Sequence, residues 1–137
     1  MDRKRRFSAF VARDRDPRST IIEALQFVRD FLPGSSLDER ARIKAVIIVE
    51  ELVSNVLRHG GNGRDVSLTM VLDDVEDGVA LDLEDDGAPF DPTSATEFDG
   101  PDPRTGGGIG LAIVRTWGED ISYTRAGERN VLRLTIR

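Results

Sequence analysis

Residues 51–61 read Glu51-Leu-Val-Ser-Asn55-Val-Leu-Arg58-His59-Gly60-Gly61, with polar side chains at regular intervals in an apolar setting. Glu51, Asn55 and His59 are spaced i, i+4 and i+8, so they share one face of a helix. Such a stripe faces either solvent or a ligand. In the functional interpretation, Asn55 offers an oxygen to a hard cation such as Mg²⁺, and Glu51 orients or deprotonates a nucleophile. An ordinary solvated face is the alternative.

Helical patterns precede this stretch. Residues 36–39 (Ser-Leu-Asp-Glu) fit a capping box, which predicts that the long helix begins near Leu37 and continues to the stop at Gly60-Gly61. Asp16-Pro17 provides an N-cap followed by proline, and apolar residues at helical spacing then run to Pro33-Gly34. An earlier helix is therefore expected there, and the weakly alternating residues 6–12 are expected to form an edge strand.

Downstream, the hydrophobic period changes from about 3.6 to about 2 residues, which indicates strands. Residues 66–72 and 79–83 alternate on either side of a predicted turn at 74–78. The remaining expected elements are a loose stretch at 87–108, a short helix at about 110–117, and closing strands at 121–125 and 130–137. This order predicts one domain over residues 1–137, an α/β two-layer sandwich whose mixed, mostly antiparallel sheet has helices packed on one face.

Composition excludes several classes of protein. The 137 residues include 19 basic and 25 acidic side chains, a formal net charge of −6, which argues against a nucleic-acid binder. With one His and no Cys, the chain offers neither disulfides nor an ordinary structural zinc site. No apolar run reaches the ~20 residues of a membrane span, and the charged start leads into no signal-peptide core. We therefore expect a cytoplasmic protein.

Charge is segregated along the chain. Residues 1–18 carry seven Arg or Lys against three Asp, whereas residues 73–102 carry twelve carboxylates and no Lys or Arg. The basic start and the predicted helix after it are candidates for contacting an acidic partner, because complementary charge steers encounter. A merely solubilising terminus is the alternative.

Two glycine-containing segments could contact a nucleotide. Asp85-Asp-Gly87-Ala-Pro-Phe90 leaves a predicted strand, and a carboxylate such as Asp85 can accept a hydrogen bond from an exocyclic amine. Residues 106–111 (Gly-Gly-Gly-Ile-Gly-Leu) run into a predicted helix, where backbone N–H groups favour a polyanion. They match neither a Walker loop nor the dinucleotide pattern. A polar turn and a flexible loop are the respective alternatives.

In this order, the three motifs resemble those of the GHKL (Bergerat-fold) ATPases, and within them the RsbW/SpoIIAB-like anti-sigma serine kinases. Residues 51–60 look like the N-box, residues 85–92 like the first glycine box and residues 106–111 like the second. The closing strands are similar to the last hairpin of the family, so the resemblance covers nearly the whole chain. It implies the Bergerat, or histidine-kinase-like ATPase, fold.

The resemblance also implies roles for individual residues. Asn55 would ligate the Mg²⁺ that bridges the ATP phosphates, Asp85 would receive the adenine amine, and Glu51 would be the general base. The triple-glycine loop and residues 91–105 would form a lid over the phosphates, with Arg104 its only cation. The nucleotide-binding set that the resemblance implies is Asn55, Arg58, His59, Asp85, Gly87, Phe90, Arg104, Gly106, Gly107, Gly108, Ile109, Gly110 and Leu111.

A protein serine kinase is the activity that the resemblance implies. Because His59, the only histidine, lies inside the N-box, autophosphorylation on histidine in cis is excluded. The implied protein is an anti-sigma factor that uses ATP to phosphorylate a small anti-anti-sigma (STAS-type) antagonist in a partner-switching pathway. Its expected partners are a sigma factor, that antagonist and a second copy of itself in a homodimer. The alternative is a non-catalytic, ATP-binding anti-sigma or regulatory module.

Overall fold

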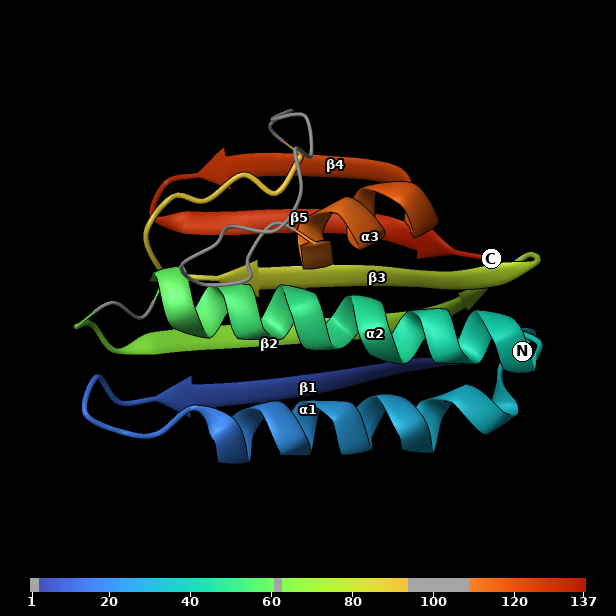
Figure 1. Cartoon of the computed structure of the whole chain (residues 1–137), viewed down its shortest axis with the longest axis horizontal. Helices are drawn as coiled ribbons and strands as arrows, with labels where there is room; N and C mark the ends of the chain where they lie inside the picture. Colours follow the sequence, from blue (N-terminus) through green and yellow to red (C-terminus); the bar gives the residue numbers. More distant parts are fainter. Residues whose placement is uncertain (1–2, 61–62, 94–108) are drawn as a thin grey trace.

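One layer of the molecule is a sheet and the other is made of helices (Figure 1). The computed structural model describes residues 3–60, 63–93 and 109–137. Its five strands are β1 (Lys4–Val11), β2 (Val66–Val75), β3 (Gly78–Asp85), β4 (Glu119–Ala126) and β5 (Arg129–Ile136), in the order β1-β2-β3-β5-β4. The predicted two-layer sandwich is confirmed. Its strand pairings are antiparallel throughout the described residues, whereas the prediction allowed a mixed sheet.

Alternating side chains explain why only one face of the sheet is covered. Along β2, Leu68 and Met70 point into the core, whereas Thr69 lies on the outer face. The helices α1 (Arg18–Phe31), α2 (Glu39–Asn55) and α3 (Ile109–Trp117) lie over the inner face (Figure 1). Ile48 of α2 and Met70 of β2 belong to the same buried cluster and are both fully buried. The long helix is thereby fixed across the middle of the sheet.

The hairpin between β2 and β3 is tighter than the predicted turn at 74–78. Val75 pairs with Gly78, so only Glu76 and Asp77 form the turn, and Asp77 adopts a positive φ of 58°. Asp tolerates this left-handed conformation better than most residues, which suits it to the second position of the turn. The tight turn fixes the register that places Asp85 at the opposite end of β3.

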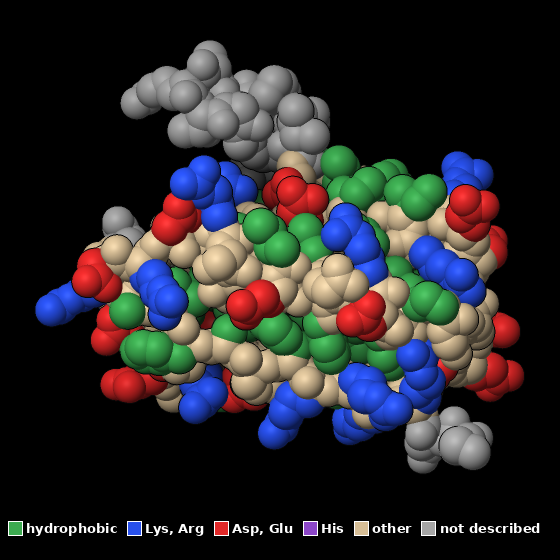
Figure 2. Space-filling model, turned by 90° about the horizontal axis from the view of Figure 1, so that it is seen from below, with side chains coloured by type: hydrophobic (Ala, Val, Ile, Leu, Met, Phe, Trp, Pro, Cys, Tyr) green, Lys and Arg blue, Asp and Glu red, His purple; other side chains and the backbone are tan. Residues whose placement is uncertain are grey.

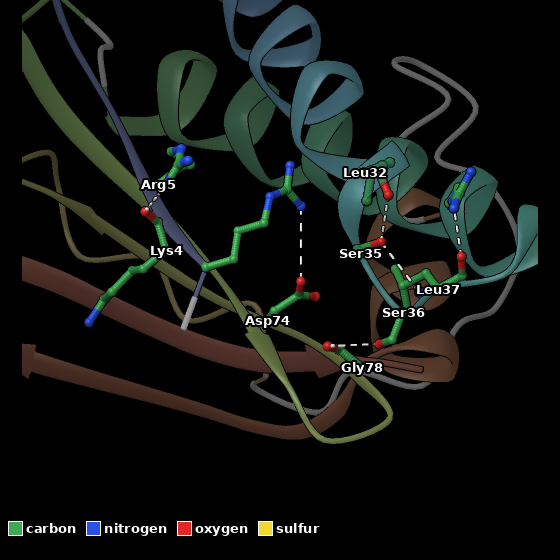
Figure 3. A network of polar contacts seen from close by, with 10 residues as sticks. Lys4, Arg5, Leu32, Ser35, Ser36, Leu37, Asp74 and Gly78 are labelled. Carbon is green, nitrogen blue, oxygen red and sulfur yellow. Dashed lines mark hydrogen bonds and ion pairs between the residues drawn. The ribbon is translucent and has the colours of Figure 1, made fainter. Parts of the chain in front are cut away.

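The start of α2 differs from the predicted capping box. Asp38, not Ser36, is the N-cap, and its Oδ1 accepts the Ala41 N–H at 2.8 Å. Ser36 instead donates from its hydroxyl to the Gly78 carbonyl at 3.5 Å, a contact visible in Figure 3. Ser35 also acts outside the helix, because its hydroxyl donates to the Leu32 carbonyl at 2.6 Å and accepts the Leu37 N–H. The helix therefore begins two residues later than predicted.

The end of α2 also departs from a regular helix. The α-helical part stops at Asn55, and residues 56–60 continue as a π-helical turn. Turns of this type are rare and occur frequently at functional sites. The expected helical region does extend to Gly60, with a wider last turn than the 3.6-residue pattern predicts.

Charged side chains surround this core. Figure 2, which views the molecule from the side of α1 and β1, shows Lys and Arg side chains along its lower rim. Lys4, Arg5 and Arg6 of β1 are all exposed. β1 is an edge strand, as predicted, and basic side chains on an edge discourage pairing with other chains. Among the described residues, no helix is long and apolar enough to span a membrane.

The observed cap leads to a test of the fold. Asp38→Ala removes the acceptor of the Ala41 N–H and should lower the free energy of unfolding by about 1 kcal/mol. Ser36→Ala, the matched control at the position predicted from sequence, should change it by less than about 0.5 kcal/mol. Urea unfolding followed by circular dichroism measures both. A larger loss for Ser36→Ala than for Asp38→Ala would contradict the observed helix start.

Candidate functional site

A pocket opens between the end of α2 and the ends of β3, β4 and β5. From α2 and the following turn it receives Leu52, Asn55 and Val56, and from the segment after β3 it receives Phe90 and Pro92. The strands contribute the remaining lining side chains, which are Leu83, Asp85, Tyr123, Asn130 and Leu132. The pocket is therefore apolar over most of its wall, with a small number of polar groups, as expected of a small-molecule site.

Asp85 is the acidic group of this pocket. It lies at the last position of β3 and is only 4% exposed. Its Oδ1 accepts the Gly87 N–H at 2.9 Å and the Asn130 Nδ2–H at 3.0 Å. Both of these donors use the same oxygen, and among the described residues none donates to Oδ2. The carboxylate is thus held in place with one oxygen available to a ligand that carries an N–H donor.

Asn130 of β5 positions this carboxylate. The β3–β5 register places Asn130 directly opposite Asp85, and Asn130 is 5% exposed. Its Nδ2 also donates to the Ala88 carbonyl at 3.0 Å, and its Oδ1 accepts the hydroxyl of Tyr123. With its amide oriented by these partners, Asn130 points a donor at Asp85 and fixes the loop that follows β3.

Arg125 of β4 ties the same loop to the sheet. Its Nη1 donates to the Gly87 carbonyl at 2.8 Å and to the Asn130 Oδ1 at 3.2 Å. The Gly87 N–H therefore donates to Asp85 and the Gly87 carbonyl accepts from Arg125, so both hydrogen bonds restrict the backbone conformation at this residue. Gly87 itself is buried.

Burial raises the pKa of Asp85 above its ordinary value, because the low-polarity surroundings disfavour the charged form. The hydrogen bonds from Asn130 and Gly87 act in the opposite direction, since both stabilise the carboxylate. The neighbouring Asp86 adds to the upward shift of the pKa and Arg125 opposes it. Desolvation is the largest of these effects, so the folded protein holds a proton on Asp85 more tightly than the unfolded chain does.

Asn55 presents the second polar group of the pocket. Its Nδ2 is buried and has no hydrogen-bond partner among the described residues. Because an unsatisfied buried amide is costly, the side chain is best explained by a ligand that completes its hydrogen bonding. The described residues contain no cluster of three or more His, Asp or Glu side chains suited to a metal ion. Asn55 can therefore supply one ligand to Mg²⁺, provided that phosphates and waters supply most of the others.

Glu51 lies one helical turn before Asn55 and faces α3. A Cβ atom built on Gly110 would lie 1.7 Å from Glu51 Oε2, so the carboxylate occupies the space beside the first turn of α3. Glycine has no Cβ atom, so Gly110 allows the Glu51 carboxylate to lie this close to α3. The partly exposed Leu111 follows it on the same turn. Glu51 thus lies between the pocket and the segment that leads into α3, although it does not line the pocket itself.

The structure brings together part of the predicted site. Asn55, Asp85 and Phe90 line one pocket, and Gly87 is bonded to Asp85 at its edge. Arg58 is exposed and lines a different cleft, described below. Arg104, Gly106, Gly107 and Gly108 lie outside the described residues, as do the side chains of His59 and Ile109. The proposed lid over the phosphates is therefore not described beyond Thr93.

Sequence reasoning missed Asn130, Tyr123 and Arg125 as site residues. A signal for Asn130 was present, because it occupies the inward-facing position of a strand that otherwise buries Leu132, Leu134 and Ile136. A polar residue in an apolar row needs a partner. No comparable signal marks Tyr123 or Arg125, whose roles depend on the pairing of β4 with β5.

Comparison with known proteins identifies the family. The model of the histidine kinase-like ATPase domain matches residues 15–136, which include the whole pocket. The chain belongs to this family. It is also 27% identical over 124 residues to the serine/threonine-protein kinase BtrW of Bordetella bronchiseptica, with 85% of each chain covered.

Membership in the histidine kinase-like ATPase family confirms the resemblance to the GHKL and RsbW-like proteins. An ATPase domain binds ATP, so the pocket containing Asp85 and Asn55 is interpreted as the nucleotide pocket. The chain is thus a kinase-like ATPase domain whose acidic and amide groups converge at one end of the sheet.

Replacing Asp85 with Asn tests this interpretation. The amide oxygen can accept the two hydrogen bonds that Oδ1 now accepts, whereas its NH₂ group faces the ligand in place of Oδ2. We expect Asp85→Asn to lose ATP binding in calorimetry while remaining folded. Asp82→Asn, on the outer face of the same strand, should bind ATP like the wild type. Unchanged ATP binding by Asp85→Asn would contradict the assignment.

The stability of the wild-type protein should depend on pH through Asp85, and the same variant tests this. Because the pKa of Asp85 is raised in the folded state, the unfolded chain releases this proton first as pH increases. Stability should therefore fall between the ordinary aspartate pKa and the raised folded pKa, and the loss should be complete above the latter. Asp85→Asn should lack this fall and should be at least as stable as the wild type at neutral pH, as measured by urea unfolding across pH.

Proposed function

We propose that the protein is an ATP-dependent protein serine kinase that acts as an anti-sigma factor and phosphorylates a small STAS-type antagonist. The observation that carries the proposal is the convergence of Asp85 and Asn55 on one pocket, with Glu51 a single turn away on the same helix. The similarity to a bacterial serine/threonine-protein kinase supports the choice of reaction. Here the pocket holds the nucleotide, and catalysis depends mainly on positioning and charge stabilisation.

Adenine recognition is the task of the Asp85 end of the pocket. The exocyclic amine of adenine would donate to Asp85 Oδ2, since Oδ1 is already engaged by Gly87 and Asn130. The apolar side chains of Leu83 and Leu132 would contact the faces of the base. This arrangement selects a purine with an amine donor at that position.

The phosphates would extend from the base past Asn55 toward the start of α3. Bound Mg²⁺ would neutralise part of the negative charge of the phosphates. Asn55 would hold it through the amide oxygen, while its buried and unpartnered Nδ2 would donate to a phosphate or to a bound water. The N-terminal end of α3 (Ile109–Trp117) adds backbone N–H groups and a favourable helix dipole near the phosphates.

Glu51 would act on the substrate serine. Its carboxylate lies against the first turn of α3, where the terminal phosphate is expected. There it can accept the hydroxyl proton as the serine oxygen attacks phosphorus and ADP leaves. A general base of this kind contributes about 10²–10⁴-fold to the rate.

The kinase proposal is tested by phosphoryl transfer from labelled ATP. Wild-type protein with Mg-ATP and candidate STAS-type antagonists should place label on a serine. Glu51→Gln should reduce the rate by about 10²–10⁴-fold while ATP binding is retained. The neighbouring Glu50→Gln is a matched control, because Glu50 is exposed and should leave the rate unchanged.

Two outcomes would contradict the proposal in different ways. Transfer that survives Glu51→Gln would remove the assigned role of Glu51 while leaving a kinase. Tight ATP binding without transfer to any candidate would instead favour a non-catalytic binding module, in which nucleotide organises a docking surface.

A further inference from the structure

A second cleft lies on the other side of α2 from the nucleotide pocket. It is formed by the β1–α1 loop, the π-helical turn after α2 and the loop before β2. Four arginines line it, namely Arg13, Arg15, Arg58 and Arg64. The buried side chains of Val11, Leu57 and Val66 also line it. The cleft therefore combines guanidinium groups with an apolar base.

The four guanidinium groups have no ion-pair partners in the part of the chain that the structure describes. The one hydrogen bond recorded for any of their side chains is a 3.4 Å contact from Arg64 Nη2 to the Asp86 carbonyl. Arginines on the sheet behave differently, since Arg129 pairs with Glu84 and Arg133 pairs with Asp82. The cleft thus concentrates unneutralised positive charge in a protein whose net charge is −6.

Two of the three carboxylates in the same loops are already engaged, and the third, Asp14, is exposed with no contact recorded among the described residues. Asp16 pairs with Arg18 at 2.6 Å, and its Oδ1 accepts the Arg18 N–H. Asp65 Oδ1 accepts the backbone N–H of Arg13 at 2.9 Å. These contacts fix the two loops, yet they do not pair with the guanidinium groups of the cleft. The four arginines are exposed, and like charges brought this close together repel one another and raise the local positive potential, which an acidic ligand would relieve.

The cleft and the nucleotide pocket share one wall. Asn55 and Val56 line the pocket, whereas the next two residues, Leu57 and Arg58, line the cleft. A ligand in the cleft would therefore contact the π-helical turn that directly follows the amide predicted to meet the phosphates. The two binding events would occur within about one helical turn of each other.

We propose that this arginine cleft docks an extended, acidic segment of a protein partner beside the nucleotide pocket. Guanidinium groups bind carboxylates in a bidentate manner, and the apolar base would receive the stems of the partner's side chains. The overall negative charge of the protein disfavours nucleic acid as the occupant. The docking surface does not depend on phosphoryl transfer, so it can exist whether or not the protein is a kinase.

A fluorescent peptide of alternating Glu and Ser serves as the probe. Anisotropy at low ionic strength should show binding to the full chain, weakening as salt is added. Arg13→Glu/Arg15→Glu should weaken binding by about tenfold or more, since two attractions become repulsions. Arg5→Glu/Arg6→Glu makes the same change in net charge on exposed residues of β1 and should retain most of the affinity.

Nucleotide binding separates this proposal from the proposed function. Both double variants should bind ATP like the wild type, because none of the four substituted residues lines the nucleotide pocket. Amide shifts induced by the peptide in NMR should cluster in residues 11–17, 57–58 and 63–66. Equal loss of peptide affinity in the two variants, shifts elsewhere, or tighter binding of a single-stranded oligonucleotide than of the peptide would overturn the proposal.

Discussion

Everything at the pocket depends on holding a carboxylate inside a largely apolar wall. Asp85 meets this constraint with two donors on Oδ1, the Gly87 N–H and the Asn130 amide, while Arg125 fixes the loop around them. Desolvation still raises the pKa of Asp85, so the ionised carboxylate lowers the stability of the folded protein. A strained or destabilised polar group is typical of a functional site.

The long helix α2 converts this local arrangement into a site. Packing of Ile48 and Val49 on the sheet fixes the helix, and its C-terminal end then carries Asn55 into the pocket opposite Asp85. Glu51 reaches the start of α3 from the same helix. The π-helical turn that follows turns Arg58 toward a separate cleft. One helix thus contributes to the expected nucleotide contact, the expected proton transfer and the proposed partner contact.

The sequence predicted the elements well because their periodicity is local. Alternation identified β2 and β3, and Asp85 was recognised at the end of a strand. The predicted start of α2 was wrong because Ser36 and Asp38 are both residue types that cap helices well. Only tertiary contacts, such as the hydrogen bond from Ser36 to Gly78, decide between them. Asn130 was missed because it meets Asp85 only through the β3–β5 register. The arginine cleft joins two loops and the π-helical turn, so the basic N-terminal run alone did not reveal Arg58 and Arg64 as neighbours.

Adenine recognition by Asp85 is tested most directly with a nucleotide that lacks only the exocyclic amine. Calorimetry would compare Mg-ATP with the magnesium complex of purine riboside triphosphate. A hydrogen bond from a neutral donor to a buried carboxylate is worth about 1.5–3 kcal/mol, so the analogue should bind roughly 10- to 100-fold more weakly. Equal affinities for the two nucleotides would contradict the account, because Asp85 Oδ2 would then have no part in reading the base.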